Sequence, residues 1–301
     1  MIMENNINFI SYGMRNIQKL KLKFLPIEFS IIKLKLNSKL PNWILKCDLY
    51  FISKSDTSVS VLCPSKYIPK KYYSIDKWNG FKIDGNFPFS AVGILQSVIA
   101  PLAVNKISIL TFSTFETDYI FVQKRNLDKS INVLSKHFAL DTIYKIAKAK
   151  KHFNDGKKLF LQYANSLNYD LCFQNFDKEL KSIDKEYNNP NGALILAYKN
   201  KLAIGCVGIR KFSNKTAELK RMFVQKKYRG NKIGQTMLEL ALDISNELNY
   251  KKIRLDTLPS MKKAHKLYRD NGFVEIPSYR FNPIKGTIFM QKYLSDKKVK
   301  K

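Results

Sequence analysis

Segment 218–248 constrains the fold of this chain most strongly, because it combines a strand, a tight glycine-containing turn and an amphipathic helix. Residues 218–224 form a β-rich run, and the turn 225–231 follows without a break. Apolar residues then recur at the spacing of one helix face, at Ile233, Met237, Leu240, Ala241, Ile244 and Leu248. We therefore expect a mixed sheet packed against helices in this part of the chain.

The rest of the C-terminal half predicts further elements of the same sheet. Asn200-Lys201 is expected to form the turn of a hairpin between two β-rich runs. Ser260 can cap a helix that ends near Asn271, and Gly272 can terminate that helix in the left-handed conformation. The expected strands are 193–199, 203–212, 216–224, 252–258 and 287–293, and a further helix is expected at 157–166.

The N-terminal half carries a weak internal repeat. "FISKSDTSVSVL" (51–62) and "TFSTFETDYIFV" (111–122) align at an offset of 60 residues, and both predict a strand, a polar turn and a strand. Apolar spacing predicts a helix before the second hairpin and another at 126–137. The apolar face of the first helix consists of Leu95, Val98, Ile99 and Leu102. We interpret the repeat as two βαββ-type units, although two unrelated hairpins would give the same pattern.

A chain of 301 residues is long enough for two domains with separate cores. We expect their boundary between residues 138 and 150, and assign 20–139 to the first domain and 140–296 to the second. The strand-like segment 140–147 could close the first sheet or open the second, and the sequence leaves this open.

The composition limits the partners that we expect. A net charge of +29 would suit a polyanion, but the lysines are spread along the whole chain, so we expect no nucleic-acid partner. No apolar run reaches the ~18 residues of a membrane-spanning helix. The four cysteines are far apart and the three histidines are scattered, so reduced thiols, a cytoplasmic location and no metal are expected.

The turn of the central segment has the chemistry of a phosphate site. The first turn of a helix presents unpaired N–H groups and a partial positive charge, so it can hold an anion. Gly230 and Gly234 allow the backbone to approach a ligand closely. Arg229 and Lys232 add positive charge beside the same point.

Four segments of the C-terminal half resemble the GNAT superfamily of N-acetyltransferases. They are "AELKRMFV" (217–224), "YRGNKIG" (228–234), "IRLDTL" (253–258) and "AHKLYRDNGF" (264–273). The resemblance covers residues 140–296 and implies acetyl-CoA as co-substrate, with its pyrophosphate on the glycine turn. The implied cofactor-binding residues are Met222, Phe223, Val224, Arg229, Gly230, Asn231, Lys232, Ile233 and Gly234. Two positions depart from the family pattern, because Lys232 stands where glycine is usual and Met261 where asparagine is frequent.

The resemblance also implies catalytic roles for two residues. An amine must lose its proton before it attacks the thioester, and Glu218 is the expected general base, acting through water. Tyr268 is the expected acid for the leaving thiolate, and the amides around Phe223 and Val224 are expected to stabilise the oxyanion. Two structural alternatives stay open: Glu218 could pair with Lys220 or Arg221, and Tyr268 could be a core aromatic. Residues of "SYRFNPIKG" (278–286) are candidates for the acceptor pocket.

The first domain resembles tandem ACT-like domains of the CASTOR type, which bind amino acids. The segments that carry this resemblance are "LPNW" (40–43), "TSVSVLCP" (57–64), "KWNGFKIDGNFPFSAVGIL" (77–95) and "ISILTFSTFETDYIFV" (107–122). It implies an amino-acid site near Ser90, Ser113, Thr114 and Asp118. Alternatively, these four residues only form turns and caps.

The sequence thus predicts an α+β protein, with an ACT-like (ferredoxin-like βαββαβ) domain followed by a GNAT-fold mixed sheet flanked by helices. The predicted activity is transfer of an acetyl group to a primary amine of a small molecule, with an amino acid as effector. The alternative is a non-catalytic sensor that binds CoA and an amino acid. No membrane partner is expected, a homodimer is compatible with the sequence, and the acceptor is not specified.

Overall fold

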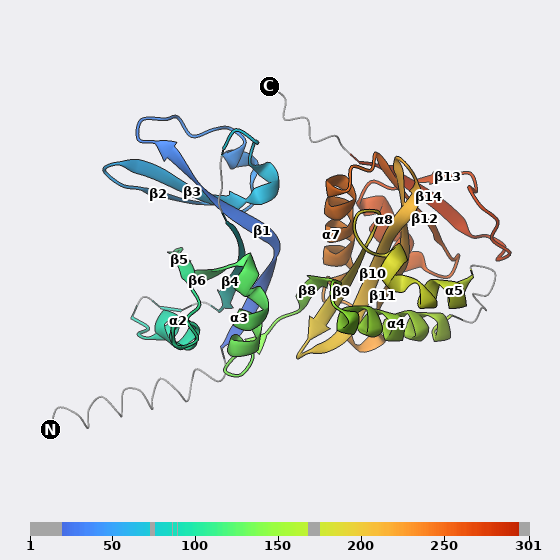
Figure 1. Cartoon of the computed structure of the whole chain (residues 1–301), viewed down its shortest axis with the longest axis horizontal. Coiled ribbons are helices and arrows are strands. Elements are labelled where there is room, and N and C mark those ends of the chain that lie inside the picture. Colours follow the sequence, from blue (N-terminus) through green and yellow to red (C-terminus); the bar gives the residue numbers. More distant parts are fainter. Residues whose placement is uncertain (1–19, 73–75, 86, 89, 168–174, 295–301) are drawn as a thin grey trace. The chain divides into compact units, whose positions relative to one another are not determined.

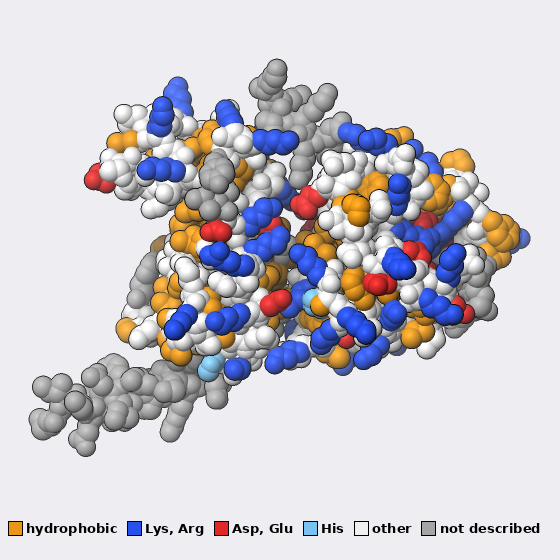
Figure 2. All heavy atoms as spheres, in the orientation of Figure 1, with side chains coloured by type: hydrophobic (Ala, Val, Ile, Leu, Met, Phe, Trp, Pro, Cys, Tyr) orange, Lys and Arg blue, Asp and Glu red, His pale blue; other side chains and the backbone are white. Residues whose placement is uncertain are grey.

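The computed structural model describes residues 20–294 except 73–75, 86, 89 and 168–174 (Figure 1). The chain divides into two compact units, Met1–Thr142 and Ile143–Lys301. Lysine and arginine side chains are scattered over the visible face of each unit (Figure 2). None of the described helices combines the length and hydrophobicity needed to cross a membrane. Cys172 lies outside the described residues.

The first unit is a seven-stranded sheet with two α-helices. In chain order its elements are β1 (Lys21–Lys35), β2 (Phe51–Lys54), β3 (Ser58–Pro64), β4 (Lys77–Asp84), α2 (Ile94–Val104), β5 (Ile109–Ser113), β6 (Asp118–Gln123), α3 (Leu127–Leu134) and β7 (Ala139–Leu140). Short 3₁₀ turns lie at Ile44–Lys46, Ser65–Tyr67 and Lys124–Asn126. The strand order is β2-β3-β1-β4-β6-β5, and β7 pairs with β1 in parallel. From β4 to β7 the order of elements is the predicted βαββαβ.

Both predicted hairpins of the first unit are confirmed, as β2–β3 and β5–β6. Although β2 and β5 stand at opposite ends of the strand order, Phe51 of β2 stacks on Phe112 of β5 with ring centroids 4.8 Å apart. The sheet must therefore curl, and an aromatic cluster that includes Phe29, Trp78 and Phe121 fills its concave side. Between β1 and β2 the described chain forms only the turn Ile44–Lys46, so a second ACT-like unit stays a prediction.

The second unit is also a seven-stranded sheet, in the order β13-β14-β12-β11-β10-β9-β8. Its strands are β8 (Ile143–Ile146), β9 (Ala193–Lys199), β10 (Leu202–Ser213), β11 (Thr216–Val224), β12 (Lys252–Thr257), β13 (Val274–Ile276) and β14 (Ile288–Tyr293). Its helices are α4 (Lys150–Asn165), α5 (Phe176–Lys181), α6 (Ile183–Glu186), the 3₁₀ turn Lys226–Tyr228, α7 (Ile233–Glu247) and α8 (Lys262–Asp270). Among the described strand pairs of this unit, only β11 and β12 run parallel.

Most local predictions for the second unit are confirmed. Asn200 and Lys201 have φ of 47° and 67°, as a tight hairpin between β9 and β10 requires, and Gly272 ends α8 with φ of 78°. The Ser260 cap is wrong, because Met261 occupies the N-cap of α8 and no side chain caps it. The segment 140–147 is divided, since Leu140 pairs with Leu22 whereas β8 pairs with β9.

A β-bulge interrupts β11 at Arg221, and a buried ion pair holds it. Lys220 and Phe223 are three positions apart on β11, but their partners on β10 are only two positions apart, and Arg221 has φ of 53°. Both nitrogens of the Arg221 fork bind Glu179 of α5, at 3.0 and 2.6 Å, and both side chains are 2% exposed. Tyr187 donates a further 2.5 Å hydrogen bond to Glu179. The bulge is thereby fixed to the helices on one face of the sheet.

This ion pair also determines the ionisation of Glu179. Burial, the largest single cause, would raise the pKa of the carboxyl group, but the hydrogen bonds and charge of Arg221, together with the charge of Lys220 and the hydrogen bond of Tyr187, hold the pKa below its ordinary value. A carboxyl group with a lowered folded-state pKa stabilises the fold at neutral pH, and this contribution is lost as the pH falls towards the lowered pKa.

We expect Glu179→Ala to lower the free energy of unfolding by about 3–5 kcal/mol, because it leaves the Arg221 charge buried without its partner. Urea denaturation at pH 7 measures this loss. The control is Glu186→Ala, since Glu186 pairs with Arg210 in a more exposed position and Arg210 keeps Glu218 as a second partner. Equal losses in the two variants would contradict the structural role of the Arg221 pair.

Candidate active site

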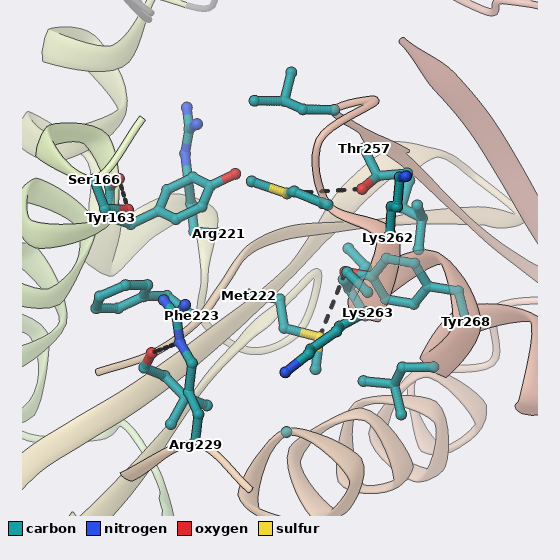
Figure 3. Close-up of a pocket in the computed structure, with 18 of the residues that line it drawn as sticks. Tyr163, Ser166, Arg221, Met222, Phe223, Arg229, Thr257, Lys262, Lys263 and Tyr268 are labelled. Atoms are coloured by element: carbon teal, nitrogen blue, oxygen red, sulfur yellow. Dashed lines mark hydrogen bonds between the residues drawn. The ribbon is translucent and has the colours of Figure 1, made fainter. Parts of the chain in front are cut away.

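The site begins where strands β11 and β12 separate. Their parallel ladder joins residues 216–218 to residues 252–254. Both strands are fully described, and they form no further pairs with each other after these residues. A cavity of 1270 Å³ opens beyond that point, between residues 219–224 of β11 and 255–258 of β12 (Figure 3). Helices α4, α7 and α8 and the turns beside them supply further parts of the wall. The divergence of two neighbouring strands thus creates the space for a ligand inside the sheet.

The predicted phosphate turn lies at this cavity. Eight of the nine predicted cofactor-binding residues line it: Met222, Phe223, Val224, Arg229, Gly230, Lys232, Ile233 and Gly234. Asn231 is not among the lining residues, and its side-chain amide donates to the Tyr228 carbonyl at 3.2 Å. The binding role of all nine residues stays a prediction.

The backbone of the turn explains the departure at Lys232. Gly230 has φ of 90°, and Lys232, the N-cap of α7, has φ of 56°. Left-handed conformations cost about 1–2 kcal/mol for a residue with a side chain and nothing for glycine, which explains why glycine suits this position. Lys232 tolerates the strain and leaves the first amides of α7 without a side-chain cap. The turn therefore keeps the donor groups that an anion needs.

Tyr268 on α8 is both a core aromatic and a residue of the cavity wall, so its position fits both interpretations of the sequence. It belongs to the buried core beside Phe273, with ring centroids 5.6 Å apart, and it also lines the cavity. Its hydroxyl group donates to the sulfur of Met222 at 3.6 Å (Figure 3). Burial raises the pKa of Tyr268 well above its ordinary value, so the phenol keeps its proton at neutral pH. A protonated hydroxyl group on the cavity wall can donate a proton to a bound ligand.

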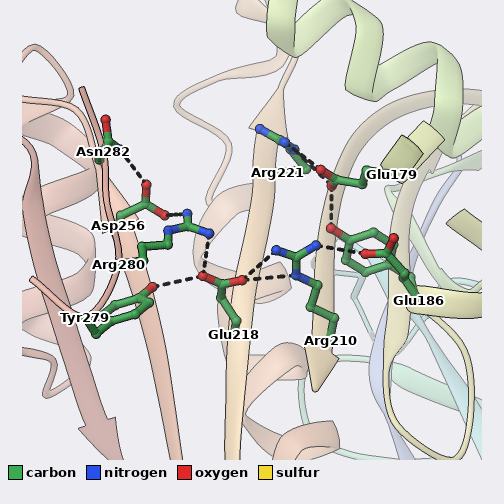
Figure 4. Close-up of polar contacts among 10 residues, drawn as sticks. Glu179, Glu186, Arg210, Glu218, Arg221, Asp256, Tyr279, Arg280 and Asn282 are labelled. Carbon is green, nitrogen blue, oxygen red and sulfur yellow. Dashed lines mark hydrogen bonds and ion pairs between the residues drawn. The ribbon is translucent and has the colours of Figure 1, made fainter. Parts of the chain in front are cut away.

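Glu218 lies deeper, in a network of polar contacts that crosses the sheet (Figure 4). Its side chain accepts bonds from Arg210 at 2.9 and 3.0 Å, from Arg280 at 2.9 Å and from Tyr279 at 3.0 Å. The residue is 1% exposed and borders a separate hollow of 360 Å³ rather than the main cavity. Glu218 therefore does not line the main cavity together with Tyr268. Arg221, one of its two expected partners, pairs with Glu179 instead.

The network continues to β12 through residues that the sequence reading did not connect. Arg280 also pairs with Asp256, and Asn282 donates to the same carboxylate at 3.0 Å. The expected acceptor segment 278–286 is thus tied to both diverging strands, and its Ile284 lines the cavity. Lys220, Arg221 and Asp256 line the cavity as well, and their only sequence signal was their place on strands beside the glycine turn.

The four residues predicted to bind an amino acid lie in two segments of the first unit. Ser113 donates to Asp118 at 2.5 Å, and the Thr114 hydroxyl donates to the Thr117 carbonyl at 3.0 Å, all within the β5–β6 turn. Ser90 is exposed in the stretch before α2. The observed contacts are those of a hairpin turn, and ligand binding here stays a prediction.

Comparison with known proteins gives each unit a relative. Residues 161–273 match the Acetyltransferase (GNAT) family and residues 73–136 match the ACT domain. An uncharacterized N-acetyltransferase of Schizosaccharomyces pombe is 32% identical over 150 residues, which cover 49% of this chain and 92% of that protein. The rat cytosolic arginine sensor for mTORC1 subunit 1 is 43% identical over 47 residues, 16% of this chain and 14% of the sensor.

Among solved structures, a GNAT-family acetyltransferase of Staphylococcus aureus superposes with a TM-score of 0.45 at 25% identity, covering 52% of this chain and all of that one. The family match and the yeast relative, which is covered almost completely, agree on the C-terminal unit. The chain therefore belongs to the GNAT family of acetyltransferases, enzymes whose co-substrate is acetyl-CoA.

Proposed function

We propose that this enzyme transfers the acetyl group of acetyl-CoA to a primary amine of a small molecule. The observation that carries the proposal is the cavity between the diverging strands β11 and β12, because the glycine turn forms one part of its wall and Tyr268 another. A long co-substrate could place its pyrophosphate at the turn and its thioester near Tyr268 within one continuous space.

The charge of the cavity wall supports this placement of the co-substrate. The pyrophosphate would bind the first amides of α7, beside Gly230 and Gly234, where the helix end favours an anion. Positively charged side chains surround the same space. The lining residues of this kind include Lys226, Arg229, Lys232, Lys262 and Lys263.

The free edge of β11 supports the chemistry proposed at the thioester. Beyond residue 218 this strand no longer pairs with β12, so backbone N–H groups that a regular ladder would use are available there. We assign oxyanion stabilisation to the amides around Phe223 and Val224. Tyr268 would then donate its proton to the leaving thiolate as the carbon–sulfur bond breaks.

We further propose that the ACT-like domain binds an amino acid as an effector. Support comes from the similarity of the N-terminal part to arginine sensors, which suggests arginine as the first ligand to test. The same similarity favours the second candidate function, a sensor that binds CoA without transferring an acetyl group. Release of free thiol from acetyl-CoA with a panel of amines would distinguish the two, since only the enzyme releases it.

Gly230→Glu should weaken acetyl-CoA binding by at least about 100-fold, because it places a negative charge where the pyrophosphate is expected. Isothermal titration calorimetry measures the affinity. Gly230→Ala is the matched control, since a Cβ at this position would meet nothing within 4 Å and only the backbone would be strained. Equal affinities in the two variants would remove the turn from the binding site.

Tyr268→Phe should lower kcat by about 10²-fold or more, while the acetyl-CoA Kd changes little, because only the proton donor is lost. Steady-state kinetics and calorimetry measure the two quantities. Tyr250→Phe is the control, because the Tyr250 hydroxyl group binds the Asn191 carbonyl at 2.7 Å in the core. A parallel loss of turnover and of affinity in Tyr268→Phe would argue against the acid role.

L-arginine should raise the unfolding temperature of the full chain. In Asp118→Asn the same rise should need an arginine concentration at least about tenfold higher, because a ligand ammonium group would lose its partner carboxylate. Thermal denaturation across an arginine titration measures the effect. Asp84→Asn is the control, because Asp84 lies in the same unit and forms an exposed pair with Lys21. An arginine response that Asp118→Asn leaves intact would exclude this residue from the site.

A further inference from the structure

Lys220 occupies an unusual position for a lysine. It lies on β11 between Glu218 and the bulge at Arg221, at the point where the strands diverge, and only 4% of it is exposed to solvent. It nevertheless borders the cavity that we assign to acetyl-CoA and the acceptor. A buried amine on the wall of an acetyl-transfer site can reach a bound substrate without first crossing bulk water.

The other groups around the cavity leave few alternatives for proton transfer from the acceptor. Of the described lining residues, Asp256 is the only carboxylate, and none is a histidine. Asp256 accepts bonds from Arg280 and Asn282, one on each carboxylate oxygen. His265 is buried outside the lining, with Nε2 2.8 Å from the Leu258 carbonyl oxygen. Glu218, the base expected from the sequence, faces the separate hollow.

The charged groups that act on Lys220 lie on its own strand and on three other segments. Glu218 and Arg221 lie on its own strand, Asp256 on β12, Arg280 on the segment after β13, and Glu179 on α5. Burial lowers the pKa of Lys220 to about 7, with Arg221 and Arg280 acting in the same direction and the carboxylates of Glu218 and Asp256 opposing them. A large fraction of the amine is therefore neutral at neutral pH, and the nearby carboxylates stabilise it once it is protonated.

We propose that Lys220 is the general base of the acetyl transfer. The inference rests on the proposed function, because it needs an amine acceptor in the cavity. The neutral Nζ takes a proton from the ammonium group of the acceptor and becomes an ammonium ion itself. The free amine then forms the carbon–nitrogen bond at the thioester carbonyl, the carbon–sulfur bond breaks, and the thiolate receives the Tyr268 proton. The new amide nitrogen loses its extra proton to the Tyr268 phenolate, so the only proton left over is the one on Lys220. Glu218 and Asp256 act as positioning residues for the protonated lysine.

The pH dependence of turnover tests this role with the most active acceptor from a panel of the twenty amino acids and common polyamines. In the unmodified enzyme, kcat/KM should rise with a single ionisation near pH 7, because the lysine must be neutral. Lys220→Met should lower kcat/KM at pH 7 by about 10²-fold or more. This deficit should become smaller as the pH rises towards the pKa of the free acceptor. Lys220→Arg should be equally impaired, because arginine stays protonated.

Controls separate a chemical role from a structural one. Acetyl-CoA affinity and the urea midpoint identify a variant that has lost its fold. Lys263→Met, at another lysine of the cavity wall, should change the KM for acetyl-CoA but keep the ionisation near pH 7. A deficit in Lys220→Met that is the same at every pH, or full activity in Lys220→Arg, would overturn the proposal.

A direct titration does not depend on a functional variant or on a known acceptor. In protein labelled with ¹³C at lysine Cε, the Lys220 resonance, assigned by its absence in Lys220→Arg, should titrate near pH 7. An ammonium form that persists above pH 9 would overturn the base role. If no amine released thiol while Lys220 titrated near neutrality, the proposed transfer to small amines would fail instead, and the base role for that reaction with it.

Discussion

The buried pair between Arg221 and Glu179 is the contact on which the active site depends. Arg221 adopts a left-handed conformation in the middle of a strand, which is unfavourable for any residue with a side chain. The bidentate bond to α5 compensates for that strain and fixes the bulge. Because the bulge follows the last residue of the β11–β12 ladder, it marks where the sheet opens, and the cavity lies directly beyond it.

A second set of charges holds the opened sheet in shape. Arg280 contacts Glu218 on β11 and Asp256 on β12, so one side chain joins the two strands at the point where their ladder ends (Figure 4). Buried carboxylates are costly unless each oxygen is hydrogen-bonded, and the arginines meet that requirement. In this arrangement Lys220 is a buried lysine that also lines the cavity, which supports its proposed exchange of a proton there.

Local patterns allowed much of the fold to be predicted. The period of the apolar residues located α7 to within one residue of its end, and the turn at Asn200-Lys201 has the positive φ angles that a tight hairpin requires. These features depend on neighbours in the sequence. The prediction of Ser260 as the cap was wrong, because α8 begins at Lys262 and Met261 is its N-cap. The exact end of a helix depends on the path of the chain before it and is hard to predict from local sequence. Likewise, the sequence could not assign the segment 140–147 to one sheet. Pairing in the fold assigns Leu140 to the first sheet, through β1, and β8 to the second, through β9.

By itself the sequence determined the family, the order of the elements and the turn expected to bind the co-substrate, because each is encoded in residues close together in the chain. Only the tertiary structure decided the environment of the ionisable groups. Glu218 was the base expected from the sequence and stays a prediction, but the sequence did not show that Arg210 and Arg280, 8 and 62 positions away, pair with its carboxylate. In the sequence Lys220 was only a possible partner of Glu218, yet in the fold just 4% of it is exposed to solvent. Burial and charge depend on contacts between distant segments, and those contacts exist only in the folded chain.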